Sequence, residues 1–140
     1  MPTRSANAEW KGGVKGQGSF RGQTGLGGQY NFSSRFENGA GSNPEELLAA
    51  AEATCYTMTL CGNLEKAGTP ASRIETQAMC TIDRAGDIFK ITGIKLVVRG
   101  TVPNIDPGAF QRLAQEAREV CPVSLALKGG VRLELDCKLI

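Results

Sequence analysis

The sequence contains no histidine, no pair of cysteines separated by two residues and no long apolar run. Without histidine the chain cannot build a Ser-His or Cys-His catalytic pair, a His-ligated zinc site or the usual imidazole proton shuttle. Without a C-x-x-C motif, a structural zinc site would need four scattered thiolates, so we expect no metal. Catalytic chemistry is therefore left to cysteine, arginine, carboxylates and the backbone.

Charge and apolar patterning also exclude two classes of partner. The net charge is only +2, and acidic and basic residues are interspersed, so we expect no nucleic-acid partner. No apolar segment resembles a signal peptide or reaches membrane length, so we expect no membrane partner. The five cysteines are an odd number, and we interpret the protein as cytoplasmic with its thiols reduced at rest.

The length of 140 residues, with 41% hydrophobic residues, predicts a single domain spanning residues 1–140. Ten of the eighteen glycines fall within residues 1–42. This region is predicted to form two or three short antiparallel strands joined by glycine turns, with Tyr30, Phe32 and Phe36 alternating along the last of them. A segment with so little side chain is marginal alone and is expected to lean on residues 43–140 or on a second copy of the chain.

Residues 43–140 are predicted to form a helix and sheet body. The pair Asn43-Pro44 begins a helix, and Gly68 ends it. Capping residues, helical spacing and the alternation of apolar and polar residues predict the other elements. The predicted elements are a helix over 44–67, a hairpin of strands over 73–83 and 87–102, helices over 107–121 and 122–127, and a strand over 131–140. The predicted order is βββ-α-ββ-α-α-β, an α+β fold.

The cysteines differ in what surrounds them. Cys80 and Cys137 lie on the apolar faces of alternating strands, and Cys61 does not share a helix face with Cys55, so all three are interpreted as packing residues. Cys55 shares a helical stripe with Glu45 and Glu52.

A carboxylate one turn from Cys55 opposes its thiolate. At ~6 Å, the charge of Glu52 would cost roughly 2 to 3 kcal/mol and raise the pKa of Cys55. A working nucleophile at this position needs a cation, and we expect it to be an arginine. Cys121 stands directly before Pro122 and the start of a helix, a position whose free N–H groups favour a thiolate. Two such different cysteines favour a dithiol pair over a single nucleophile.

Three separated motifs resemble the OsmC/Ohr family of peroxidases, and the resemblance covers essentially the whole chain. Residues 43–58 (NPEELLAAAEATCYTM) resemble the family's first-cysteine helix, and residues 121–127 (CPVSLAL) its second-cysteine segment. Residues 34–37 (SRFE) match the RFE loop of the OsmC branch. The resemblance implies an intertwined homodimer in which two long helices pack centrally, with sheets flanking them.

The resemblance also implies a function in oxidative stress defence, the thiol-dependent reduction of organic hydroperoxides, with hydrogen peroxide as a further candidate substrate. By position, Cys55 would be the peroxidatic cysteine and Cys121 the resolving one, with which it forms a disulfide. Arg35, of the same subunit or of the partner, would pair with the thiolate, and Glu45 would hold Arg35 in a bidentate pair. No metal or organic cofactor is implied. An external dithiol, either a lipoylated protein or another thiol, would restore the cysteines.

Around this site, Phe36, Tyr56 and Met58 are candidates for an apolar substrate pocket. The sequence departs from the family at Glu52, where OsmC proteins usually carry histidine. Glu52 is either a non-essential part of the pocket surface or a residue that retunes the thiol and the choice of substrate. Two alternatives to the peroxidase remain: a thiol-disulfide oxidoreductase or redox sensor that uses the same two cysteines, and a non-catalytic binding dimer.

Overall fold

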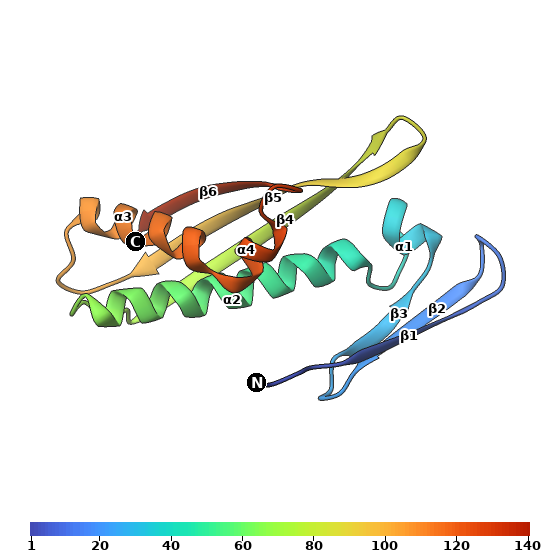
Figure 1. Ribbon diagram of the computed structural model, residues 1–140, viewed down its shortest axis with the longest axis horizontal. Coiled ribbons are helices and arrows are strands. Elements are labelled where there is room, and N and C mark those ends of the chain that lie inside the picture. Colours follow the sequence, from blue (N-terminus) through green and yellow to red (C-terminus); the bar gives the residue numbers. More distant parts are fainter. The chain divides into compact units, whose positions relative to one another are not determined.

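The computed structural model describes residues 1–140 as two compact units, residues 1–47 and 48–140 (Figure 1). The α+β class is confirmed, with one more helix than the predicted order. The elements are β1 (Ala6–Lys11), β2 (Gln17–Gly22), β3 (Gly27–Tyr30), α1 (Phe32–Phe36), α2 (Pro44–Lys66), β4 (Arg73–Ala85), β5 (Ile88–Thr101), α3 (Pro107–Val120), α4 (Pro122–Leu127) and β6 (Arg132–Leu139). No helix combines the length and the apolar character that crossing a membrane requires.

The first unit contains the antiparallel sheet β1-β2-β3, as the glycine pattern predicts. Three aromatic side chains pack together on this sheet: the ring centroids of Trp10 and Tyr30 lie 5.4 Å apart, and those of Phe20 and Tyr30 lie 6.2 Å apart. A Cβ atom at Gly18 would come within 2.6 Å of both Trp10 and Tyr30. Glycine at this position therefore lets the two rings close over the strand.

Helix α1 corrects the prediction that residues 32–36 continue a strand. Asn31 caps this helix, because its side chain accepts from the Ser34 amide at 2.8 Å while the Ser34 hydroxyl accepts from the Asn31 amide at 2.9 Å. The rings of Phe32 and Phe36 lie 5.1 Å apart, as expected for residues four apart on a helix. The capping box, an N-x-x-S pattern, therefore overrides the apparent alternation of aromatic residues.

The second unit is built on the sheet β4-β5-β6. Strands β4 and β5 form the predicted antiparallel hairpin, with a register shift between Thr81 and Ile82. Strand β6 pairs with β5 in parallel, which requires a crossover connection, supplied by α3 and α4. Because β6 pairs only with residues 93–100 of β5, the tip of the hairpin extends beyond it (Figure 1).

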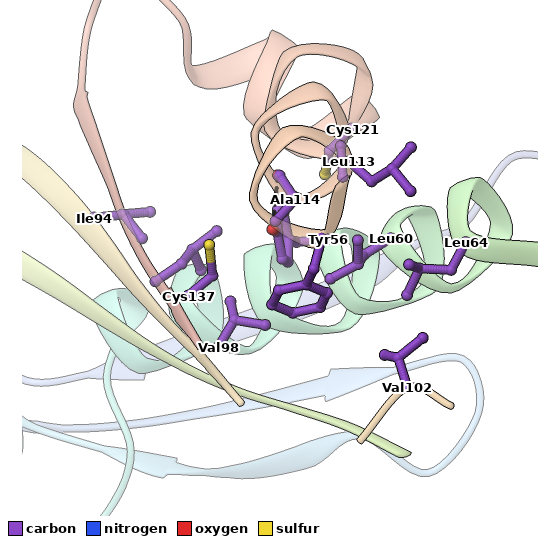
Figure 2. Packing of buried hydrophobic residues seen from close by; sticks show 13 residues of the cluster. Tyr56, Leu60, Leu64, Ile94, Val98, Val102, Leu113, Ala114, Cys121 and Cys137 are labelled. Carbon is purple, nitrogen blue, oxygen red and sulfur yellow. Dashed lines mark hydrogen bonds between the residues drawn. The ribbon is translucent and has the colours of Figure 1, made fainter. Parts of the chain in front are cut away.

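Helices α2 and α3 pack on one face of this sheet and enclose the core (Figure 2). The central core residues are Tyr56, Leu60 and Leu64 of α2, Ile94, Leu96 and Val98 of β5, and Phe110, Ala114 and Ala117 of α3. Cys137 is buried in this core and Cys80 packs against it, which agrees with their interpretation as packing residues. The core therefore fixes α2 against the α3–α4 segment that carries Cys121.

A buried hydrogen bond joins the two helices. Tyr56 is fully buried, and its hydroxyl donates to the carbonyl of Ala114 at 2.8 Å. Replacing Tyr56 with phenylalanine is expected to lower the free energy of unfolding by about 1 kcal/mol, measured by urea denaturation. As a control, Thr54→Val removes an exposed hydroxyl that bonds only to its own helix, and is expected to change stability by less than about 0.5 kcal/mol. Equal losses in the two variants would contradict the role of the Tyr56 hydroxyl.

Candidate active site

In the first unit, Arg35 and Glu45 form an ion pair. Arg35 lies in the last turn of α1, and its Nε and Nη2 donate to Glu45 Oε1 at 3.1 and 2.8 Å. Both nitrogens share Oε1, and Oε2 is buried without a hydrogen-bond partner. The ring of Phe36 lies 5.2 Å from the Arg35 guanidinium, so it flanks the cation.

The start of α2 holds Glu45 in place through Asn43. The Asn43 side chain accepts from the amide of Glu46 at 2.8 Å, which caps α2 as predicted. The same side chain donates to the carbonyl of Ser34 at 3.0 Å. Asn43 therefore ties the first turn of α2, which carries Glu45, to the helix that carries Arg35.

In the second unit, Cys55 and Cys121 come together although they are far apart in the sequence. Cys55 is partly exposed on α2, and Cys121 is fully buried at the junction of α3 and α4. The two side chains are within hydrogen-bonding reach, an interaction that raises the pKa of Cys55. All five cysteines are free thiols. The predicted thiol pair is therefore assembled in its reduced form.

Burial is the largest cause that raises the pKa of Cys55 above its ordinary value. Cys121 and then Glu52 also raise it, so the predicted direction of the Glu52 effect is right, but its charge is a minor cause. The backbone N–H of Val123 acts in the opposite direction, because it donates to the Cys55 sulfur. The first turn of α4 thus supports Cys55, whereas the Cys121 side chain makes no capping hydrogen bond there.

Glu52 is fully buried and lies near Cys121, whereas the sequence related it only to Cys55. Its Oε1 accepts from the Ser124 hydroxyl and lies 4.0 Å from the Cys121 sulfur, which donates to it. Its Oε2 is buried without a hydrogen-bond partner. Glu52 therefore belongs to the interior around Cys121 and not to a solvated helix face. Sequence reasoning missed Ser124, although its spacing of three residues from Cys121 on a short helix was a signal.

The remaining candidate residues differ in their surroundings. Tyr56 is a core residue whose hydroxyl is already bonded, and Met58 is 80% exposed on α2. Phe36 accompanies Arg35 in the first unit. No group of three or more cysteine or acidic side chains is arranged to hold a metal ion. A hollow in the first unit, lined by parts of β1, β2 and β3, contains none of the candidate residues.

The role of Glu52 in setting the acidity of Cys55 can be tested directly. Glu52→Gln removes a charge that raises the pKa of Cys55, so the pH profile of Cys55 alkylation is expected to move to lower pH. The movement is expected to be small, because burial remains the larger cause. The rate of iodoacetamide labelling at Cys55, followed by peptide mass spectrometry across pH, measures it. An unmoved profile would contradict the effect of Glu52.

Known proteins share both this sequence pattern and this fold. Residues 37–136 match the family model described as OsmC-like protein. The chain is 38% identical over 138 residues to peroxiredoxin OsmC of Escherichia coli, which covers 96% of each chain. It is 36% identical over 107 residues to the organic hydroperoxide resistance protein OhrB of Bacillus subtilis, covering 73% of this chain and 74% of that protein.

Solved structures agree with these sequence matches. The crystal structure of Bacillus subtilis OhrB matches with a TM-score of 0.76 at 27% identity, covering 96% of this chain and 98% of that one. An organic hydroperoxide resistance protein from Elizabethkingia anophelis matches in fold with a TM-score of 0.80 at 22% identity, covering 100% and 98%. The chain is therefore a member of the OsmC-like protein family.

Proposed function

We propose that this protein is a cysteine-based peroxidase that reduces organic hydroperoxides to alcohols. The observation that carries the proposal is that the Cys55 and Cys121 thiols lie within hydrogen-bonding reach of each other, Cys55 partly exposed and Cys121 fully buried. The relatives named peroxiredoxin OsmC and organic hydroperoxide resistance protein support a peroxide-related redox role.

In the first step, the Cys55 thiolate attacks the distal oxygen of the hydroperoxide. A sulfur–oxygen bond forms, the oxygen–oxygen bond breaks, and the leaving alkoxide takes a proton to become the alcohol, which leaves a sulfenic acid on Cys55. The Val123 amide supports the thiolate. Arg35, held by Glu45 and flanked by Phe36, supplies the positive charge that a buried thiolate needs, from its own subunit or from a partner subunit.

In the second step, Cys121 attacks the sulfur of the Cys55 sulfenic acid. A disulfide forms and water leaves, so both thiols are oxidised for each hydroperoxide reduced. An external dithiol, a lipoylated protein or another thiol, then reduces the disulfide by exchange. The buried position of Cys121 supports its role as the resolving thiol, because substrate reaches Cys55 first.

The working form is a homodimer in this proposal. Met58 is 80% exposed on α2, and Trp10 and Leu26 of the first unit are 39% and 56% exposed. A second copy that covers these side chains would bury apolar surface and would allow Met58 to line a substrate pocket, favouring organic over hydrogen peroxide.

The test is to mix the reduced protein with cumene hydroperoxide and follow the loss of free thiols. The peroxidase predicts rapid loss of two thiols for each hydroperoxide, with cumyl alcohol as the product. Slow reaction with peroxide but rapid exchange with a protein disulfide would instead identify a thiol-disulfide oxidoreductase. No reaction with either would identify a binding protein.

A further inference from the structure

A carboxylate occupies a position on α2 where the packing favours an apolar residue. Glu52 heads a series with Tyr56, Leu60 and Leu64, each four residues after the last, and all four side chains are 0% exposed. Such a series faces the interior along one side of a helix. Burying a carboxyl group there costs free energy that an apolar side chain would not cost. Its presence needs a reason other than packing.

The contacts of Glu52 point toward Cys121. Ser124 is 1% exposed, and its hydroxyl donates to Oε1, the same oxygen that the Cys121 thiol approaches at 4.0 Å. Because Ser124 lies one helical turn after Cys121, the short helix α4 places both donors on one carboxylate oxygen. The other oxygen, Oε2, is buried without a partner, so it remains free to take a proton.

We propose that Glu52 is the general base of the resolving step, a catalytic role that rests on the proposed peroxidase function. As Cys121 attacks the sulfur of Cys55, its thiol proton passes to the Glu52 carboxylate. The sulfur–sulfur bond forms, and the sulfur–oxygen bond of the sulfenic acid breaks. The leaving hydroxide takes up one proton and departs as water, and Glu52 gives up the proton it received, so the step consumes no other reagent.

Few of the titratable groups that act on Cys55 and Tyr56, the neighbours of Glu52 on α2, could replace it. Apart from Cys55 and Tyr56 themselves, these groups are Cys121, Arg118 near the end of α3, and Cys137 on β6. Arg118 is the cation among them, and it donates to the carbonyl of Leu133. Arginine stays protonated and cannot accept a proton. Burial raises the pKa of Tyr56, so its phenolate is not a base near neutral pH.

A purely structural role makes a different prediction. If Glu52 only anchors α4 through Ser124, glutamine would accept the same hydrogen bond with its carbonyl oxygen, and the reactivity of Cys121 would not change. If Glu52 is the base, glutamine keeps the shape of the site but cannot take the proton.

The experiment follows the attack of Cys121 on Cys55 without peroxide. Dithiobis(nitrobenzoate) reacts with Cys55 to form a mixed disulfide, and this reaction releases a first thionitrobenzoate. Attack of Cys121 on the mixed disulfide then releases a second thionitrobenzoate. This second release is expected to be absent in Cys121→Ser. In Glu52→Gln, this second release is expected to be about a hundredfold slower than in the wild type near neutral pH. The difference in rate is expected to become smaller at high pH, because hydroxide then removes the proton of Cys121. Glu119→Gln, an exposed carboxylate at the end of α3, serves as the matched control and is expected to leave the rate unchanged.

A second arm uses cumene hydroperoxide with dimedone trapping. In Glu52→Gln, the sulfenic acid of Cys55 is expected to accumulate, whereas the wild type passes quickly to the disulfide. A wild-type rate of thionitrobenzoate release in Glu52→Gln at every pH overturns the role of Glu52 and leaves the peroxidase function standing. A wild-type protein in which cumene hydroperoxide produces neither a sulfenic acid nor a disulfide overturns the peroxidase function instead, whatever rate of thionitrobenzoate release is measured.

Ser124→Ala gives a variant that keeps the carboxylate, in case Glu52→Gln does not fold. Without the Ser124 hydroxyl, Glu52 Oε1 loses the hydrogen-bond donor that positions it next to Cys121. The release of the second thionitrobenzoate is therefore expected to be about tenfold slower. Circular dichroism and a urea transition confirm that each variant is folded. Should Glu52→Gln be unfolded, an unchanged rate in Ser124→Ala overturns the proposal.

Discussion

Cys55→Ser is expected to lower the rate of cumene hydroperoxide reduction by at least about a thousandfold, because the variant lacks the nucleophile. Cys121→Ser has a different expected result. The first oxidation of Cys55 proceeds at close to the wild-type rate, but it stops at a sulfenic acid, since the buried partner thiol is gone. Rapid mixing with one equivalent of hydroperoxide, followed by dimedone labelling and intact-mass analysis, separates the two variants.

The matched control for these variants is Cys61→Ser. Cys61 is also partly exposed on α2, but no hydrogen bond links it to another cysteine, and burial alone raises its pKa. Its loss is expected to leave peroxide reduction within about twofold of the wild type. The account would be contradicted if Cys55→Ser still reduced peroxide and Cys61→Ser did not. That result would show that Cys61, and not Cys55, is the nucleophile.

Arg35→Met is expected to slow the oxidation of Cys55 by roughly 10²- to 10³-fold, the usual cost of removing one preorganised charge-stabilising donor. Burial is the main cause that raises the pKa of Cys55, and the Val123 amide, which lowers it, does not reverse the direction of the shift. Arg35 would stabilise the thiolate, so its loss is expected to move the pH profile of Cys55 oxidation to higher pH. Stopped-flow kinetics with cumene hydroperoxide across pH measure the rate and the profile together.

Two further variants define how Arg35 acts. Glu45→Gln keeps the guanidinium but weakens the ion pair that holds it, and a loss of about tenfold is expected. Arg21→Met removes an exposed arginine on β2 as a control and is expected to have no effect. An Arg35→Met variant with the wild-type rate and profile would show that another group supplies the cation.

The main elements of the fold could be predicted because local signals mark their ends. Asn43 and Pro44 begin α2, Gly68 has the left-handed conformation that ends it, and Asp106 caps α3. Helix α1 was missed because its aromatic residues also fit a strand alternation, and only the reciprocal hydrogen bonds of Asn31 and Ser34 distinguish the two. A five-residue helix leaves too short a periodicity to outweigh such a pattern.

The candidate site was only partly predictable, because its key contacts cross the fold. The sequence places Glu52 one turn before Cys55, which suggested that its main effect falls on that thiol. In the structure, Glu52 bonds to Ser124 and approaches Cys121, which lie 72 and 69 residues away. These contacts depend on how α2 packs against the α3–α4 segment, and helical spacing alone does not contain that information.

The pKa of Cys55 was also only partly predictable from the sequence. A charge at a known spacing can be recognised in the sequence, and the direction of the Glu52 effect was predicted correctly. Burial and the Val123 amide are larger influences, and both arise from tertiary packing.

The most direct test of the account is peptide mapping after reaction with one equivalent of cumene hydroperoxide. Proteolysis under non-reducing conditions, followed by mass spectrometry, identifies which cysteines are joined. The account predicts a single disulfide between Cys55 and Cys121 within one chain, with Cys61, Cys80 and Cys137 still reduced. A disulfide that includes any of those three, or full consumption of the peroxide with Cys55 and Cys121 left as free thiols, would contradict it.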